Sequence, residues 1–157
     1  MTLDSALQEL VDKAGIRDVM MRYARGIDRR DMDLIASSFA PDAYVNYAGR
    51  EDQGRDNIIS RLRTSTSRFD RSTHFMGDQE IQINGDTADV ETYAIDYLFY
   101  TVEGTHYQSM GGLRYVDKMV RQNGQWQVQH RVLHIDWRRN SLVDNSAPGV
   151  DRVPVSE

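Results

Sequence analysis

The sequence of 157 residues predicts one α+β domain, in which about three helices come first and a long β-sheet follows. Before residue 70, apolar residues recur every three or four positions, which is typical of helices that are buried on one face. From His74 onward, long stretches rich in β-branched and aromatic residues alternate with turns that contain glycine, which is typical of antiparallel hairpins. We therefore expect the helices to cover one face of a curved sheet.

Three helices are expected in the N-terminal half. The first covers residues 5–27, although Gly15 could interrupt it, and the second begins after the capping residue Asp31 and ends before Pro41. Asp56 is expected to cap the third. The residues of the second and third helices that would face the core are Leu34, Ile35, Phe39, Ile58, Ile59 and Leu62.

The strands are predicted by alternation and by turn residues. A short strand is expected at residues 44–48, and longer strands are expected at 74–84, 87–102, 106–121 and 125–138. The turns between the longer strands carry the signatures Asn84-Gly85-Asp86, Glu103-Gly104 and Asn123-Gly124. The domain is expected to span residues 1–140. Residues 141–157 form a tail without periodicity, which we expect to wrap the surface or a neighbouring subunit.

Composition excludes several classes of partner. The net charge of −5 argues against binding to nucleic acid, whose phosphates require a basic surface. The arginines at positions 61, 63, 68 and 71 form a basic segment, but Asp70 interrupts it, and we interpret it as a solvated helix face. The absence of cysteine excludes disulfides, thiolate catalysis and cysteine-based metal sites.

No apolar run approaches the roughly 20 residues that a membrane span needs, so no membrane partner is expected. The first residues, Met1-Thr2-Leu3-Asp4, lack the basic region and apolar stretch of a signal peptide. A cytoplasmic location is the resulting expectation.

Asp28 and His74 are the first candidate site residues, because each is a polar residue at a position that the apolar pattern predicts to face the interior. Asp28 follows the apolar stripe of the first helix, and His74 opens the first long strand. A carboxylate on one imidazole nitrogen fixes the tautomer and stabilises the imidazolium, which makes the other nitrogen a general base near neutral pH. The alternatives are a helix-ending acid for Asp28 and a half-buried structural histidine for His74.

Several short motifs now point to a family. They are Tyr-x4-Asp at the end of the first helix, Asp-Ala before a strand, Thr-His at the start of a strand, and Trp-x4-Arg in the last strand. Their order resembles the SnoaL-like branch of the NTF2-like superfamily over roughly residues 10–138. Within that branch the pattern is similar to the hexachlorocyclohexane dehydrochlorinases and the bile acid 7α-dehydratases, which eliminate HCl or water with a His and Asp pair. The resemblance implies a cone-shaped fold that encloses a pocket.

The resemblance implies two further catalytic residues. Tyr23 matches the dehydratase pattern, and its phenol could hydrogen-bond a carbonyl or a leaving hydroxyl, although packing explains it equally well. Arg131 has the spacing of the family arginine and shares its strand face with Leu133, Ile135 and Trp137. It could stabilise an oxyanion or pair with Asp28, or it could be an exposed arginine.

Asp96 is a candidate that needs no family. The other residues on its strand face are largely apolar, so its carboxylate needs a partner or a raised pKa. That face could line the pocket. The substrate-binding residues that we expect are Val45, Tyr47, Asp96, Leu98, Leu133 and Ile135.

No metal and no cofactor are expected. His130, His134 and Asp136 could suggest a metal site, but residues four apart on one strand are separated by roughly 13 Å at ~3.3 Å per residue, too far to share an ion. No glycine-rich phosphate loop follows a strand and opens a helix.

The candidate residues and the resemblance together favour a cofactor-independent lyase of the dehydratase type, acting on a small hydrophobic substrate, open-chain or cyclic. The alternatives are an isomerase, a polyketide cyclase or a carbon-carbon lyase on the same scaffold, or a non-catalytic ligand-binding or assembly module. The predicted sheet is apolar on both faces, so we also expect a homo-oligomer. The resemblance implies a trimer from the similar enzymes or a dimer from the wider superfamily.

Overall fold

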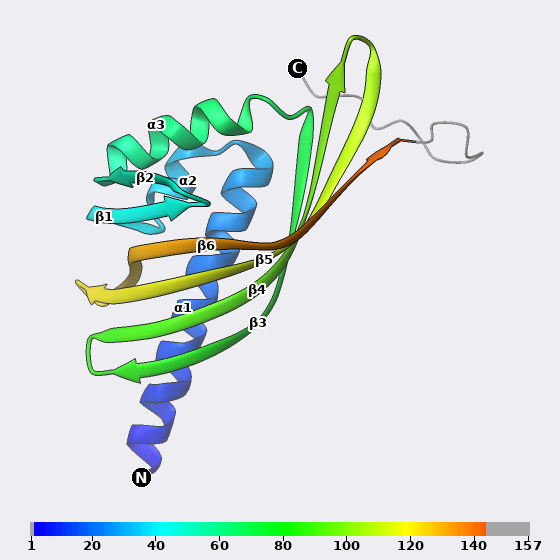
Figure 1. Cartoon of the computed structure of the whole chain (residues 1–157). Helices are drawn as coiled ribbons and strands as arrows, with labels where there is room; N and C mark the ends of the chain where they lie inside the picture. Colours follow the sequence, from blue (N-terminus) through cyan, green and yellow to red (C-terminus); the bar gives the residue numbers. More distant parts are fainter. Residues whose placement is uncertain (1, 144–157) are drawn as a thin grey trace.

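The computed structural model describes residues 2–143. Within these residues, three helices pack on a six-stranded, curved and unclosed sheet (Figure 1). The α+β class and the cone-shaped arrangement predicted from the sequence are confirmed. In chain order the elements are α1 (Leu3–Arg29), α2 (Met32–Ala36), β1 (Phe39–Tyr47), β2 (Arg50–Gln53), α3 (Arg55–Thr66), β3 (Arg71–Asn84), β4 (Thr87–Val102), β5 (Thr105–Gln122) and β6 (Gln125–Leu142).

The sheet has the strand order β2-β1-β6-β5-β4-β3. Strands β3 to β6 form an antiparallel meander, whereas β1 lies parallel to β6 and pairs with β2 in a hairpin. Figure 1 shows that the long strands bend near their middle, and that the end of the β4–β5 hairpin extends beyond the helices. The bend turns the inner face of the sheet toward the end of α1.

The turns explain why the meander forms. Glu103-Gly104 and Asn123-Gly124 both have positive φ at their two residues, as a two-residue type I′ turn requires. Ala48-Gly49 has the same geometry and joins β1 to β2. The short strand β2 was not predicted, because Ala-Gly is a weaker turn signal than Asn-Gly and because Arg50–Gln53 is charged throughout.

Two helix predictions need correction. Helix α1 is continuous through Gly15, where a Cβ atom would lie 3.1 Å from Cδ1 of Trp126, so this glycine permits close packing and does not break the helix. Helix α3 begins after Gly54 without a side-chain cap. Asp56 lies in its first turn, where a negative charge interacts favourably with the positive end of the helix dipole. The predicted cap of α2 is confirmed, because Asp31 accepts a hydrogen bond from the Leu34 N–H at 2.9 Å.

The strand boundaries also differ from the prediction. Helix α2 ends at Ala36, and Phe39 begins β1 instead of ending a helix. Strand β6 continues to Leu142, so the chain stays in the sheet beyond the predicted start of the tail. The proposed wrapping of the tail concerns mainly residues 144–157, which lie outside the described part of the chain.

The core lies between α1 and the inner face of the sheet. Ile16, Val19 and Met20 of α1 are fully or almost fully buried there, together with Phe39 of β1 and Met119 of β5. No helix within residues 2–143 is both long and apolar enough to cross a membrane.

The outer face of the sheet carries exposed aromatic residues. Phe75, Tyr93 and Trp137 are 68%, 58% and 46% exposed, respectively. Monomeric proteins seldom leave several large apolar side chains uncovered on one face. Assembly of the chain into a homo-oligomer stays a prediction.

Candidate active site

A cavity of about 390 Å³ lies between the inner face of the sheet and the ends of α1 and α3. Four of the predicted substrate-binding residues with apolar or aromatic side chains line it, namely Tyr47, Leu98, Leu133 and Ile135. Val45 does not line it, because this residue is completely buried in the core. The remaining wall is formed largely by apolar and aromatic groups, including Ile27, Leu62, Phe69, Leu113 and Tyr115.

Asp28 and His74 are in direct contact. Asp28 lies in the last turn of α1 and His74 on β3, and their Oδ1 and Nδ1 atoms are 2.7 Å apart. The other oxygen of Asp28 accepts a hydrogen bond from the His74 backbone N–H at 2.8 Å, and Ser72 Oγ donates to Oδ1 at 2.9 Å. Both side chains are largely buried, with 8% exposure for His74 and 19% for Asp28. Three hydrogen bonds therefore hold this carboxylate against the imidazole.

These bonds determine the charge of Asp28. Burial alone would raise its pKa, but the hydrogen bonds from the His74 ring, the His74 backbone and Ser72 outweigh burial and lower the pKa. An ionised carboxylate only accepts hydrogen bonds, so it selects the His74 tautomer with the proton on Nδ1. Nε2 then carries the free lone pair, and His74 lines the cavity.

A second ionic pair lies beside His74. Asp96 on β4 is paired in register with His74 on β3, and its Oδ2 accepts a hydrogen bond from Arg138 Nη2 at 2.9 Å. Both Asp96 and Arg138 line the cavity. Asp96 is only 4% exposed, and its Oδ1 atom is buried without a hydrogen-bond partner among the described residues.

Gly111 makes this pair possible. It lies on β5 between Asp96 and Arg138, and is paired in register with both. A Cβ atom at this position would come within 2.8 Å of both Asp96 Oδ1 and Arg138 Nη2. The missing side chain thus lets the arginine of β6 reach across β5 to the aspartate of β4.

Two tyrosines complete the polar part of the wall. The hydroxyl of Tyr23 on α1 lies 3.2 Å from that of Tyr47 on β1, within hydrogen-bond distance. Burial raises the pKa of Tyr47 well above its usual value, and it also raises that of Tyr23, which the nearby Arg131 opposes only in part. Both phenols are therefore neutral at physiological pH, and because Tyr23 donates to Tyr47, the hydroxyl of Tyr47 is the one free to donate to a ligand.

Arg131 lies behind the cavity instead of in its wall. It is completely buried and forms two hydrogen bonds to Asp117, from Nε at 2.8 Å and from Nη2 at 2.6 Å. Its guanidinium carbon lies 4.3 Å from the ring centroid of Tyr23 and 4.7 Å from that of Tyr115. It does not pair with Asp28. Arg131 thus packs against the rings of Tyr23 and Tyr115 and holds them in place. The arginine of β6 that lines the cavity is Arg138.

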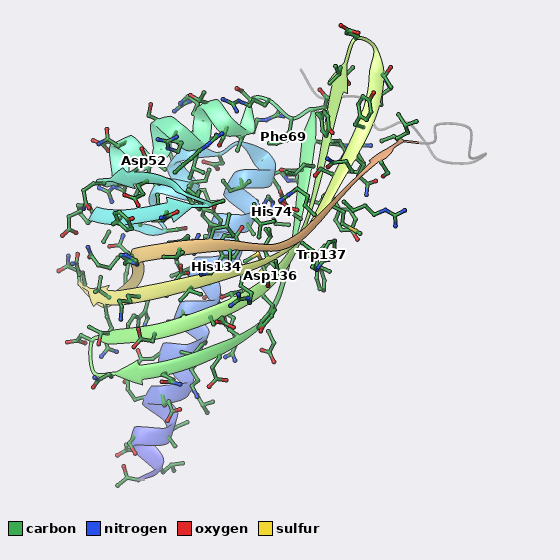
Figure 2. All side chains as sticks on the ribbon, in the orientation of Figure 1. Asp52, Phe69, His74, His134, Asp136 and Trp137 are labelled. Carbon is green, nitrogen blue, oxygen red and sulfur yellow. The ribbon has the colours of Figure 1, made fainter. Side chains whose placement is uncertain are left out.

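A β-bulge explains why alternation along β6 did not indicate Arg138 as a residue of the wall. Simple alternation along β6 places Arg131, Ile135 and Trp137 on one face and Arg138 on the other. The register of β6 against β5 shifts between Ile135 and Trp137, so alternation changes phase at Asp136. Figure 2 shows Asp136 and Trp137 on the outer side of β6, away from His74. Ser72 was also missed, although its position two residues before His74 places it on the same strand face.

The residues weighed as a metal site do not come together. His130 stacks on Tyr44 with ring centroids 4.7 Å apart, and Asp136 accepts hydrogen bonds from Arg114 on the outer face. Within residues 2–143, no three His, Asp or Glu side chains form a group that could hold a metal ion.

Three helices on a curved sheet around a lined cavity give this chain an NTF2-like cone fold. A family model described as the SnoaL-like domain matches residues 8–132. The match covers well over half of the chain, and the chain belongs to the SnoaL-like domain family.

Similar proteins come from sequence and from structure. An uncharacterized protein of Mycobacterium tuberculosis is 28% identical over 130 residues, which cover 81% of this chain and 87% of the relative. A protein of Novosphingobium aromaticivorans, provisionally assigned as a scytalone dehydratase, superimposes with a TM-score of 0.77 at 23% identity, covering 87% of this chain and 91% of that one. A hexachlorocyclohexane dehydrochlorinase superimposes with a TM-score of 0.80 at 16% identity, covering 92% and 99%. Because both solved structures are less than 25% identical to this chain, their similarity establishes the shared fold alone.

Proposed function

We propose that this protein is a cofactor-independent lyase that eliminates water or a similar leaving group from a small hydrophobic substrate. The observation that carries the proposal is the Asp28–His74 contact at 2.7 Å beside a mainly apolar cavity. Asp28 keeps the proton on Nδ1, so Nε2 of His74 is the base. The dehydratase and dehydrochlorinase structures that share the fold support this class of reaction.

In the proposed reaction, His74 Nε2 removes a proton from a carbon beside an electron-withdrawing group. The electrons of the broken C–H bond form the new double bond, and the bond to the leaving group breaks. Asp28 orients His74 and stabilises the imidazolium that forms. A leaving hydroxide needs a proton to depart as water, and the neutral phenol of Tyr47 is the donor available in the wall, where Tyr23 can replace the proton that Tyr47 gives up.

The charge-stabilising role expected for Arg131 passes to Arg138 in this proposal. Arg138 lines the cavity and is only 27% exposed, so its positive charge acts in a partly desolvated site. Asp96 holds Arg138 in place, and its unpartnered Oδ1 can accept a hydrogen bond from a substrate hydroxyl. The apolar remainder of the wall suits a hydrophobic body, open-chain or cyclic.

A screen of hydrophobic hydroxy- and chloro-ketones by mass spectrometry tests the proposal. Wild-type protein should convert at least one compound to a product lighter by one water or one hydrogen chloride, and His74→Ala should abolish the conversion. A product of unchanged mass would instead identify an isomerase that uses the same base. Conversion that survives His74→Ala would remove His74 from the mechanism.

A further inference from the structure

A second hollow adjoins the cavity. It has a volume of about 330 Å³, lies between β2 and α3, and is lined by Arg50, Asp52, Asn57, Ser60, Arg61, Thr64, Ser65 and Arg68. We call it the arginine groove. Arg50, Arg61 and Ser65 also line the apolar cavity, so the two spaces share a boundary. Figure 2 shows Asp52 between β2 and α3.

The charge of the groove is opposite to that of the whole chain. The chain has a net charge of −5, whereas the groove carries three arginines against a single aspartate. Its other lining residues are hydroxyl or amide side chains, which can all donate hydrogen bonds. A wall of this kind offers donors and positive charge in a concave space.

The arginines of the groove are not equivalent. Arg61 is neutralised by Asp52, to which it donates two hydrogen bonds, from Nε and from Nη2, the latter at 3.1 Å. Arg50 and Arg68 form no ion pair within residues 2–143, and both are exposed. Arg61 is therefore fixed at the boundary of the two spaces, and the guanidinium groups of Arg50 and Arg68 are available to a ligand.

A solvated helix face is the simpler explanation for arginines on α3. That explanation fits Arg63, which is exposed on the same helix and lines neither space. It does not account for Arg50, which comes from a different element and converges with Arg61 and Arg68 on one hollow. The convergence of β2 and α3 distinguishes the groove from a random basic surface.

We propose that the substrate carries an anionic group, a carboxylate or a phosphate, which Arg50 and Arg68 bind in the groove while its apolar body occupies the cavity. This inference rests on the proposed function, because it names the substrate class of the same site. Guanidinium groups bind carboxylate and phosphate through paired N–H donors, and such charge-assisted bonds are stronger than neutral ones. The ligand is thus an amphiphile with one charged end.

Isothermal titration with three eight-carbon probes tests the proposal without any knowledge of the reaction. The probes are octanoate, n-octyl phosphate and 1-octanol, each used as a monomer in low-salt buffer at pH 7.5. At least one anionic probe should bind about tenfold or more tightly than 1-octanol, corresponding to about 1.4 kcal/mol. The tighter of the two anions identifies the source of the negative charge. Raising the salt to about 1 M should remove the advantage of the anion, since the Debye length falls to ~3 Å.

The double variant Arg50→Gln/Arg68→Gln should lower the affinity for the anion about tenfold and leave that for 1-octanol unchanged. Arg63→Gln is the control, because it removes a positive charge from the exposed surface of α3, next to the groove in sequence but outside its lining. Equal affinities for all three probes, no binding of either anion at millimolar concentration, a salt-independent preference, or an equal loss in the control would overturn the proposal. His74→Ala should preserve the preference for the anion. The experiment therefore distinguishes a wrong assignment of the anion site from a wrong assignment of His74 as the base.

Discussion

Replacing Asp28 with Asn tests the proposed pair without changing the size of the side chain. Asp28 accepts hydrogen bonds from the His74 ring, the His74 backbone and Ser72. Asparagine has one acceptor and one donor group, so it cannot accept all three in the same arrangement. If its amide N–H₂ faces the imidazole, the proton of His74 moves to Nε2 and the base is lost.

The expected loss of activity follows from the role of the pair. General-base catalysis typically supplies ~10²- to 10⁴-fold in rate, so kcat of Asp28→Asn should fall by about that factor. The expected loss of folding free energy is smaller, about 1–3 kcal/mol, because a hydrogen bond to a charged group contributes ~1.5–3 kcal/mol and Asn retains some of the bonds.

The assay compares Asp28→Asn, His74→Ala and the double variant, using whichever compound the screen identifies. Residues that act as a unit show strongly non-additive losses, so the double variant should be about as slow as the slower single variant. Urea unfolding of each variant supplies the control for stability. Losses that multiply in the double variant, or an unchanged rate in Asp28→Asn, would refute the reasoning and leave Asp28 as a residue that merely ends a helix.

Three further predictions address other parts of the site. Burial acts to raise the pKa of Asp28, but its hydrogen bonds lower the pKa, so the ionised carboxylate stabilises the fold above the unfolded pKa of about 3.9, and this stabilisation is lost as the pH falls through the folded pKa. The difference in unfolding free energy between wild type and Asp28→Asn should therefore be largest near neutral pH and shrink below pH ~4. A difference that stays constant with pH would contradict this. Gly111→Ala should displace Arg138 from Asp96 and reduce kcat while costing about 1 kcal/mol in stability, because the new Cβ would lie 2.8 Å from both groups; normal turnover would show that the pair is dispensable. Arg131→Met should cost about 3–5 kcal/mol in urea unfolding, because it leaves Asp117 buried and unpaired, and Arg131→Met/Asp117→Leu should recover much of the loss; a stable but inactive single variant would instead place Arg131 in catalysis.

The sequence predicted the elements whose signals are local. The helical periodicity of α1, the cap at Asp31 and the Asn123-Gly124 turn each depend on residues within a few positions of one another. Strand β2 has no apolar alternation, and its pairing depends on the weak Ala48-Gly49 turn. The parallel pairing of β1 with β6 joins residues about 90 positions apart, for which one sequence carries no local signal.

The same distinction holds for the site. Asp28 and His74 each stood out against an apolar pattern, and the fold brings them together. Arg138 was missed because the bulge at Asp136 changes the phase of β6, and a one-residue shift moves a side chain to the other face. The role of Gly111 depends on three adjacent strands, so no pattern within one strand could indicate it.

The tautomer of His74 tests the central claim most directly, and its measurement needs no substrate. The chain has only four histidines, so ¹⁵N NMR of the imidazole nitrogens can be assigned by comparison with His74→Gln. In the neutral ring, we predict that Nδ1 of His74 carries the proton and Nε2 does not, and that Asp28→Asn abolishes this preference. A proton on Nε2 in the wild-type protein, or a preference unchanged in Asp28→Asn, would contradict the account of His74 as a base held by Asp28.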